Sequence, residues 1–348
     1  MTAPVNIRDV AAMAGVSVGT VSNVLNHAHL VREEKREQVE AAIERLNFVR
    51  SEPARQLRAG RSRMVGLLVL DVTNPFFTDL ARGAEEAISA SGLSVMLCDS
   101  NADEAKQDRY LTLLAEQRVY GVLIVPVGPY AAQMSRLRER RLPFVLLDTK
   151  SSDKNVCSVS VDDVGGGRMA VNHLLDQGHE SIAFVSGKGR ERQVADRAAG
   201  ARRALRQAGV RDLTVIRAAG LNVAGGRDAG RQLLAMPAFR RPTAAFCSND
   251  LLALGLLQEL TREGYRVPND MAIVGYDDIE FASSAAVPLS SVRQHCQEMG
   301  RTAAALLLEE ASGEPHIHQR VVLETELVIR SSSENVVHRG RARANHKA

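Results

Sequence analysis

The sequence contains no tryptophan, and aromatic residues make up only 4% of its 348 positions. Its four cysteines lie far apart and form no Cys-x-x-Cys pair, which favours buried, reduced thiols over a disulfide framework or a metal site. No stretch approaches about 18 uninterrupted apolar residues, and the first residues lack the basic and apolar regions of an export signal. From these absences we expect a soluble, cytoplasmic protein that has no membrane partner.

The net charge is small and unevenly placed. The formal net charge is +3, although 24% of the residues are charged. Residues 48–63 carry five arginines against one glutamate, whereas residues 64–330 hold 30 Lys or Arg and 33 Asp or Glu. The positive excess therefore lies in a short connector, where phosphate groups of a nucleic acid are the expected partner. The length suits two or three domains.

Residues 1–47 contain helix patterns and no strand pattern. Asn6 can cap a short helix over 7–14, and Ser17 can cap a second helix from Val18 to about Leu25, after a glycine turn. A third helix is expected over 33–46. Three short helices in this order predict a helix-turn-helix head.

The second helix would present short polar and methyl-bearing groups near its exposed start and outer face. Such groups can reach base edges in a major groove or donate hydrogen bonds to phosphates. The pattern alone fits equally well an interaction domain whose polar residues face solvent. The candidate DNA-contacting residues of this helix are Ser17, Val18, Gly19, Thr20, Ser22, Asn23 and Asn26.

The connector 48–63 has one short helical possibility, over 51–58, with Pro53 tolerable in its first turn. A helix of this length is marginal alone in water, so we expect it to form only against a partner. The alternative is a solvated basic linker.

From Met64 onward, apolar strand patterns alternate with helical patterns of about a dozen residues. This alternation predicts parallel sheets covered on both faces, arranged as two doubly wound lobes. A (β/α)8 barrel is less favoured, because the expected tail strand 319–329 has no helix after it. We predict a first lobe over 64–160 and 291–318, a second over 161–290 and 319–330, and a basic flexible tail over 331–348. The expected strands are 65–70, 93–98, 121–125, 144–147, 182–186, 214–216, 244–247 and 271–274.

Several motifs in order resemble the LacI/GalR family of bacterial transcription regulators. Residues 7–26, IRDVAAMAGVSVGTVSNVLN, match the pattern of the family's DNA-binding head almost completely. In the connector, Phe48, Ala54, Arg55 and Leu57 match, whereas Arg50, Ser51 and Pro53 depart from the family pattern. The body matches over 66–77, 120–126, 161–187, 244–255 and 275–282, so the resemblance covers about 5–331.

The resemblance implies a repressor, without enzyme activity, that binds near-palindromic operator DNA as a homodimer or tetramer. It implies that the connector orders on DNA, with Leu57 wedged into the minor groove and Arg55 and Arg58 beside it. It also implies an effector, a small metabolite and most simply a carbohydrate, bound between the two lobes of a periplasmic-binding-protein-like body.

Candidate effector residues follow from the resemblance and from their places at strand ends. Arg197 matches the family's effector clamp, and Asn249 and Asp277 match polar anchors of the second lobe. Each residue alone could equally be a helix cap or a hydrogen bond between lobes, but together at the carboxyl ends of strands they predict a cleft. Gly220 lies where several relatives have a stacking aromatic. The other candidates are Asp71, Asn74, Phe76, Phe77, Asp148 and Gln294.

The sequence lacks the motifs of the common catalytic and cofactor sites. There is no G-x-S-x-G, H-E-x-x-H or zinc-finger spacing. Glycines 165–167 lack the pattern of a phosphate loop and are interpreted as close helix packing, and the His-Ile-His of 316–318 as a surface turn. We therefore expect no metal, no cofactor and no enzyme. A solute-binding transport protein would lack the head, and an enzyme with a regulatory head would need a catalytic constellation.

Overall fold

A computed structural model describes residues 5–49, 61–189, 191–210 and 213–334. The chain divides into two compact units, Met1–Ser62 and Arg63–Ala348, and each is described by itself. Among the described residues, no helix combines the length and the apolar character that crossing a bilayer requires.

The first unit contains the three predicted helices, α1 (Ile7–Met13), α2 (Val18–His27) and α3 (Glu33–Arg45). The Asn6 side chain accepts a hydrogen bond from the backbone of Arg8, and the Asp9 side chain accepts one from Asn6 in return, which fixes the start of α1. Between α1 and α2, Gly15 adopts a φ of 63°, a left-handed conformation that favours glycine. The small core of this unit consists of Val10, Ala11, Val21, Val24, Val39 and Ala42.

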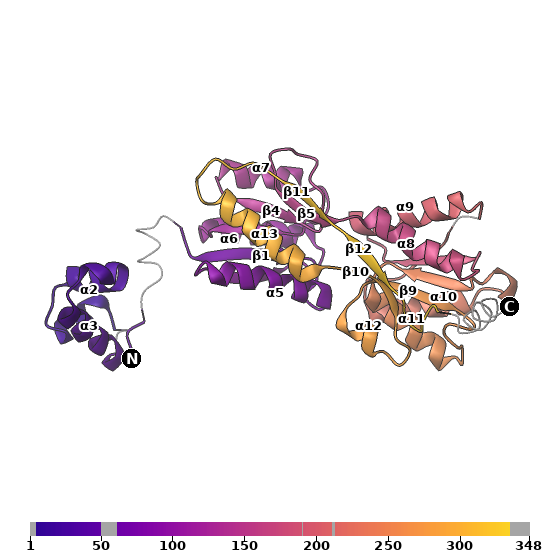
Figure 1. Cartoon of the computed structure of the whole chain (residues 1–348), viewed down its shortest axis with the longest axis horizontal. Helices are drawn as coiled ribbons and strands as arrows, with labels where there is room; N and C mark the ends of the chain where they lie inside the picture. Colours follow the sequence, from indigo (N-terminus) through magenta and orange to yellow (C-terminus); the bar gives the residue numbers. More distant parts are fainter. Residues whose placement is uncertain (1–4, 50–60, 190, 211–212, 335–348) are drawn as a thin grey trace, which may run out of the picture. The chain divides into compact units, whose positions relative to one another are not determined.

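The second unit contains two six-stranded sheets, which confirm the two doubly wound lobes and exclude a single barrel (Figure 1). In spatial order, the first sheet is formed by β11 (Arg320–Leu323), β5 (Ser158–Val161), β4 (Phe144–Leu147), β3 (Gly121–Ile124), β1 (Met64–Val69) and β2 (Ser94–Asp99). The second is formed by β12 (Thr325–Val328), β10 (Ser290–Gln294), β9 (Ala272–Asp277), β8 (Ala244–Cys247), β6 (Ile182–Ser186) and β7 (Thr214–Arg217). All pairings are parallel except β10 with β12.

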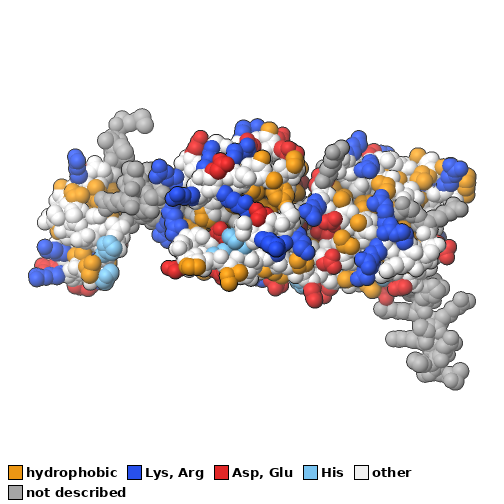
Figure 2. Space-filling model, turned by 90° about the horizontal axis from the view of Figure 1, so that it is seen from above, with side chains coloured by type: hydrophobic (Ala, Val, Ile, Leu, Met, Phe, Trp, Pro, Cys, Tyr) orange, Lys and Arg blue, Asp and Glu red, His pale blue; other side chains and the backbone are white. Residues whose placement is uncertain are grey.

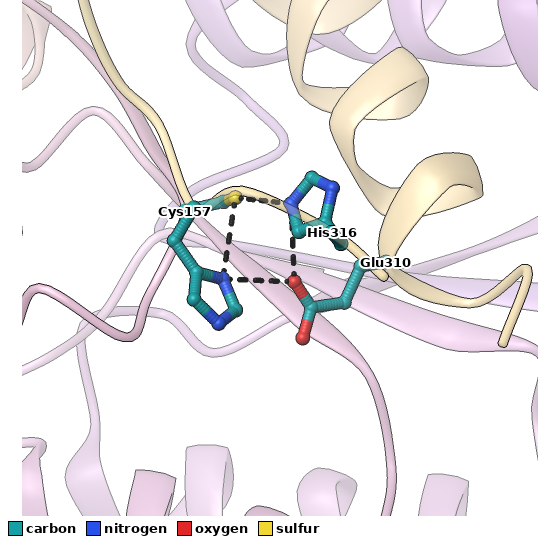
Figure 3. A group of neighbouring side chains, drawn as sticks. Cys157, Glu310 and His316 are labelled. Atoms are coloured by element: carbon teal, nitrogen blue, oxygen red, sulfur yellow. Dashed lines mark hydrogen bonds and ion pairs between the residues drawn. The ribbon is translucent and has the colours of Figure 1, made fainter. Parts of the chain in front are cut away.

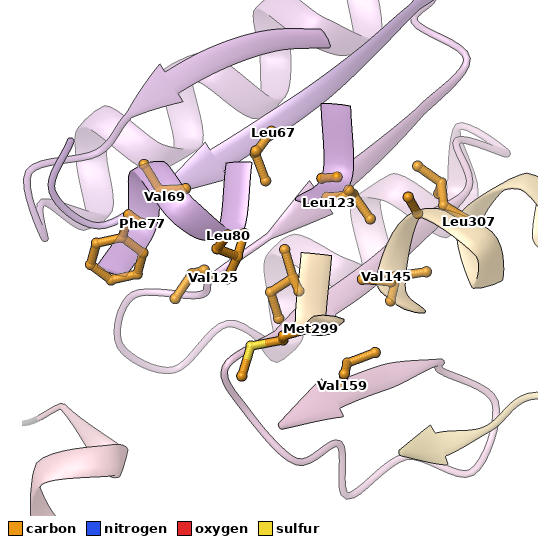
Figure 4. Packing of buried hydrophobic residues seen from close by; sticks show 14 of the residues in the cluster. Leu67, Val69, Phe77, Leu80, Leu123, Val125, Val145, Val159, Met299 and Leu307 are labelled. Atoms are coloured by element: carbon orange, nitrogen blue, oxygen red, sulfur yellow. The ribbon is translucent and has the colours of Figure 1, made fainter. Parts of the chain in front are cut away.

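Helices cover the faces of both sheets. Around the first sheet lie α5 (Pro75–Ala90), α6 (Glu104–Glu116), α7 (Ala131–Glu139) and α13 (Cys296–Glu310). Around the second lie α8 (Asp163–Asp176), α9 (Arg192–Gln207), α10 (Val223–Leu234), α11 (Asp250–Arg262) and the short α12 (Glu280–Ser284). Figure 4 shows the core of the first lobe, where aliphatic side chains of the strands meet Leu80 of α5 and Met299 and Leu307 of α13.

The chain passes between the lobes at three places, two of them later than predicted. All of β10 belongs to the second sheet, because it pairs with β9, so the return to the first lobe follows Gln294 rather than residue 291. β11 pairs with β5 in the first sheet, so the last crossing lies between Leu323 and Thr325 rather than at 319. β5 itself was not predicted, because its valines alternate with two serines that are buried here.

The first residues of the segment 331–348, which was predicted to be flexible, are held against the second lobe. Ser332 and Ser333 are buried, and the Ser332 hydroxyl donates a hydrogen bond to the Ile273 carbonyl and accepts one from the Ser290 amide. These bonds fasten residues 331–334 to the second lobe, and 335–348 lie outside the described residues.

Of glycines 165–167, which were interpreted as close helix packing, Gly167 has this role. A Cβ atom added at Gly167 would lie 2.1 Å from the carbonyl oxygen of Arg197, and one added at Gly200 would lie 2.0 Å from that of Val164. Only glycine permits this approach of α8 to α9. The motif thereby brings the backbone of Arg197 against the start of α8.

Candidate functional site

One face of α2 carries the predicted DNA-contacting residues. Val21 and Val24 point into the core of the first unit, and the residues between them point outward, because side chains three or four positions apart share a face of a helix. The Ser17 hydroxyl accepts a hydrogen bond from the Thr20 amide and thus caps the helix. Exposed on this face are Ser17, Val18, Gly19, Asn23 and Asn26, with Thr20 and Ser22 half-buried.

The polar side chains of this face differ in their hydrogen bonding and exposure. The Asn26 amide donates a hydrogen bond to the Ser22 carbonyl at 2.7 Å, so it is held along the helix. Asn23 is exposed and lies one turn earlier on the same side. The other predicted DNA contacts, Arg55, Leu57 and Arg58, lie outside the described residues.

A cleft of about 360 Å³ lies where the carboxyl ends of strands from both sheets meet. Of the nine predicted effector residues, the cleft is lined by Asp71, Asn74, Phe76, Phe77, Asp148, Arg197, Asn249 and Asp277. Gln294 does not line it; its amide donates a hydrogen bond to Asp277 Oδ1 at 2.7 Å and so orients that carboxylate from behind.

Two of the lining residues also have the structural role that the sequence left open. Asn74 caps α5 by accepting a hydrogen bond from Phe76, and Asn249 caps α11 by accepting one from Leu252. The Asn249 amide additionally donates to the Leu221 carbonyl at 2.9 Å. Both asparagines are therefore held rigidly at the edge of the cleft.

Arg197 is buried at the centre of the polar wall. Its Nε donates to Asp163 Oδ1 at 2.8 Å, and its Nη1 donates to the Ser248 carbonyl at 2.6 Å and lies 3.7 Å from Asp277 Oδ1. The guanidinium stacks on the ring of Tyr276, 3.7 Å from its centre, as a cation–π contact. Among the described residues, its Nη2 makes no hydrogen bond, so this nitrogen is available to a ligand.

Burial raises the pKa values of the carboxyl groups around Arg197. The pKa of Asp148 is raised to about 8 by burial and by the nearby Asp163, against the opposing effect of Arg197. Burial raises the pKa of Asp277 to about 6, and that of Asp163 is also raised. At neutral pH, Asp148 is therefore protonated in most molecules and can donate a hydrogen bond as well as accept one.

The backbone is strained at the same positions. Asp148 has a φ of 50° and Asp277 a φ of 105°, both in the region that side chains other than glycine rarely adopt. Such conformations cost on the order of 1–3 kcal/mol each and gather at ligand sites. Each directs its carboxyl group into the cleft from the end of a strand.

Three cleft-lining polar atoms are buried without a hydrogen bond among the described residues. They are Asp148 Oδ1, Glu191 Oε2 and Ser248 Oγ. A buried polar atom left unpaired costs about 1–3 kcal/mol, so these atoms mark positions where a ligand group would be accepted.

Sequence reasoning missed several residues of this wall. Gln193 donates two hydrogen bonds of 2.8 Å to Asp148, one to the backbone and one to the carboxylate. It lies one helical turn before Arg197, a spacing that could have revealed it. Glu191 and Ser248 carried no comparable signal.

Apolar side chains form a further wall of the cleft. Phe76 and Phe77 line the cleft with their rings 4.9 Å apart in an edge-to-face arrangement. Gly220 and Leu221 line it from the second lobe, so no aromatic ring is contributed there. The two phenylalanines therefore supply the aromatic surface of the cleft.

A second group of polar side chains corrects the prediction of a simple turn at 316–318. His316 and His318 face Cys157 and Glu310, and His316 is largely buried. None of these four residues lines the cleft. The four cysteines are free; Cys98, Cys157 and Cys247 are buried, as predicted, whereas Cys296 is half-buried.

A helix-turn-helix head joined to two lobes that enclose a polar cleft defines a DNA-binding regulator that responds to a small ligand. Residues 6–51 match the model of bacterial regulatory proteins of the lacI family, and residues 171–333 match a periplasmic binding protein-like domain. The chain belongs to the lacI family of bacterial regulatory proteins, and it is a transcriptional regulator rather than an enzyme.

Relatives match nearly the whole chain. The ribose operon repressor of Escherichia coli is 35% identical over 329 residues, which cover 94% of this chain and 99% of the relative. The lac repressor dimer bound to operator and an anti-inducer superposes with a TM-score of 0.85 at 28% identity, covering 96% of this chain and all of that one. A LacI family regulator from Enterococcus faecium with bound ribose superposes with a TM-score of 0.71 at 31% identity, over 78% and 98% of the two chains.

Proposed function

We propose that this regulator is a repressor whose effector is a neutral, hydroxyl-rich small molecule, a monosaccharide or small sugar derivative, bound in the cleft between the lobes. The cleft volume lies at the small end of the range of about 300–1,000 Å³ that ligand pockets span. The unpaired buried atoms Asp148 Oδ1, Glu191 Oε2 and Ser248 Oγ carry this proposal.

The charge of the polar wall supports a neutral ligand over an anionic one. Three carboxyl groups, those of Asp148, Asp163 and Asp277, surround the buried guanidinium of Arg197. Asp163 and Asp277 are already ion-pair partners of this cation, so a ligand carboxylate or phosphate would receive little further compensation from it. Sugar hydroxyls can donate to the carboxyl oxygens and accept from Arg197 Nη2.

The apolar wall supports a sugar as well. The C–H face of a pyranose or furanose ring packs on aromatic rings, and Phe76 and Phe77 provide them. The ribose held by the Enterococcus faecium relative is a ligand of this chemical type.

Effector binding would act on DNA through the closure of the lobes. A ligand that contacts both walls favours one relative position of the two sheets, and a coupling of about 1–3 kcal/mol to operator affinity is typical. The chain would act as a dimer or tetramer in the cytoplasm, reading a near-palindromic operator through Asn23 and its neighbours, because twofold symmetry repeats the half-site. Arg55, Leu57 and Arg58 would contact DNA in the connector.

A ligand screen tests the effector class. Neutral pentoses and hexoses, their phosphates and their uronic acids are added to the full chain, and the thermal midpoint is measured. We expect the midpoint to rise with a neutral sugar and to stay constant with the phosphate and the acid of the same sugar. Binding of only the charged forms would refute the neutral-ligand proposal.

Two variants test whether the effector binds in the cleft. Ser248→Ala and Asp148→Asn each change one polar group of the wall, and we expect affinity to fall by about 5- to 100-fold from the loss of a buried hydrogen bond. Asp270→Asn, on an exposed ion pair away from the cleft, is the control. Retention of a DNA fragment from the region upstream of the gene, with and without the sugar, then tests repression directly.

A further inference from the structure

Four side chains that can bind a metal ion converge at one edge of the first sheet (Figure 3). Glu310 is the last residue of α13, and His316 and His318 lie in the loop between α13 and β11. Cys157 immediately precedes β5, and the parallel register that pairs Ser158 with Arg320 brings it beside this loop. The Gln319 amide donates a hydrogen bond to Cys157 Sγ at 3.4 Å, which fixes the thiol against the loop.

The potential ligand atoms of the four residues surround a common point. Cys157 Sγ lies 2.9 Å from His316 Nε2 and 3.7 Å from His318 Nδ1. Glu310 Oε2 lies 3.3 Å from His316 Nε2 and 3.1 Å from His318 Nδ1, and all four ligand atoms are within 4.8 Å of one another. Tetrahedral zinc with ordinary bond lengths separates its ligand atoms by about 3.3–3.6 Å. The four separations given above lie within about 0.4 Å of that range. The two remaining pairs, each within 4.8 Å, would close to the same range around an ion.

The cluster also holds a buried acceptor that has no donor. Glu310 Oε2 is shielded from solvent and accepts no hydrogen bond from any described residue, although two imidazole nitrogens face it. A buried carboxylate oxygen in this state is costly and favours a cation beside it. The orientation of the side chains therefore suits coordination better than hydrogen bonding.

The loop conformation directs both imidazoles to the same side. His316 and His318 alternate with Ile317, whose side chain is 85% exposed on the opposite side. His316 is only 9% exposed, and its second nitrogen, Nδ1, lies 3.5 Å from Glu309 Oε2. A carboxylate on the far nitrogen of a histidine is the usual support of a metal ligand, because it leaves the near nitrogen unprotonated.

We propose that Cys157, Glu310, His316 and His318 bind one Zn²⁺ ion. One thiolate, two imidazoles and one carboxylate are ligands that zinc accepts in a tetrahedron, whereas Mg²⁺ and Ca²⁺ prefer oxygen alone. The two negative ligands balance the charge of the ion, and the thiol proton is released to solvent on binding. Four protein ligands leave no open position, so the site is structural rather than catalytic.

The ion would fasten the loop 311–319 between α13 and β11. Cys157 precedes its strand, whereas the cleft residues Asp71 and Asp148 follow theirs, so the ion lies at the end of the first sheet opposite to the effector cleft. Zinc and effector would therefore bind at the same time. The site anchors the segment that leads into the last crossing between the lobes.

Titration of the reduced full chain with Co²⁺ tests this site, because cobalt reports both thiolate coordination and geometry. We expect a thiolate-to-cobalt charge-transfer band and intense tetrahedral d–d bands that reach saturation at one equivalent, and Zn²⁺ should abolish them. Cys157→Ser should remove the charge-transfer band and weaken binding by more than 100-fold, whereas Cys98→Ser, which removes a buried thiol elsewhere in the lobe, should leave both unchanged.

A second pair of variants separates coordination from folding. Glu310→Gln should weaken Zn²⁺ binding and lower the thermal midpoint of the zinc-loaded protein, whereas Glu314→Gln in the same loop should not. Should Cys157→Ser fail to fold, His318→Gln replaces it, since that side chain is 27% exposed and tolerates change. Wild-type protein without a charge-transfer band, or Cys157→Ser with wild-type cobalt affinity, would overturn the proposal.

Discussion

Replacing Arg197 by methionine should destabilise the second unit strongly, in addition to abolishing the effector response. Methionine retains much of the apolar volume on the Tyr276 ring and removes only the guanidinium. The Asp163 carboxylate, 2.8 Å from Arg197 Nε, then remains buried without its counter-charge. Removing one member of a buried ion pair costs about 3–5 kcal/mol, and we expect a loss of this size at pH 8.

The loss of stability in Arg197→Met should depend on pH and on the charge of Asp163. Without Arg197, the pKa of the Asp163 carboxyl rises further, so the native state binds a proton that the unfolded state releases above its ordinary pKa. Stability of the variant therefore falls as pH rises, and its deficit should be smaller at pH 5 than at pH 8. Adding Asp163→Asn removes the unpaired charge, so the double variant should recover about 1–3 kcal/mol.

Urea unfolding of the wild type, both single variants and the double variant, without effector, measures this cycle. Arg266→Met, which breaks the exposed pair with Asp270, is the control and should change stability little. Both variants that lack Arg197 should fail to respond to effector. A double variant no more stable than Arg197→Met would refute the ion-pair explanation, and an Arg197→Met protein with a normal effector response would remove this residue from the site.

Three further predictions concern the carboxyl group, the glycine motif and the head. The pKa of Asp148 is raised to about 8 from 3.8, so between these pH values the native state holds a proton that the unfolded state has released, and stability falls as pH rises from 6 to 8. In urea unfolding, Asp148→Asn should make this fall less steep. An equally steep dependence in the variant would contradict the prediction. Gly167→Ala should lower the free energy of unfolding by about 1–3 kcal/mol and also weaken effector binding, because the new methyl group displaces the backbone of Arg197. Calorimetry measures the affinity for the effector, and an unchanged affinity would show that the packing at Gly167 does not position Arg197 for binding. Asn23→Ala should reduce the discrimination at one base pair by about 1–3 kcal/mol without changing the salt dependence of DNA binding. Arg58→Ala should instead reduce the slope of log affinity against log salt concentration by about 1. Fluorescence anisotropy at several salt concentrations distinguishes the two effects.

The sequence predicted candidate effector residues in motifs at the ends of strands. Asp71, Asp148 and Asp277 could be located because parallel strands bring their carboxyl ends to one edge, whereas Arg197, within α9, was predicted from the family resemblance. The sequence could not show that Arg197 is also a buried ion-pair partner. That role depends on the approach of α8 to α9, which is a property of packing.

The sequence alone could not predict which side chains meet through the pairing of strands that are far apart in the chain. Cys157 meets His316 and His318 only because β5 pairs with β11, and β5 was not predicted. A histidine pair spaced by one residue has no meaning until its partner strand is known. The positions of the lobe crossings likewise depend on strand pairing, of β10 with β9 and of β11 with β5, and the predicted positions differed because these pairings were not known from the sequence.

The three crossings between the lobes determine when during synthesis each part of the protein can be completed. The first unit needs nothing beyond residue 49, so it can fold as soon as it leaves the ribosome. The first sheet waits for β11 and the second for β12, so the first lobe cannot be completed before residue 323 has been translated, nor the second before residue 328. At about 5–20 residues per second, the head precedes both lobes by an interval on the order of tens of seconds. A nascent chain thus has a folded DNA-reading head before it can sense an effector, and a truncation before β11 would leave both lobes unfinished.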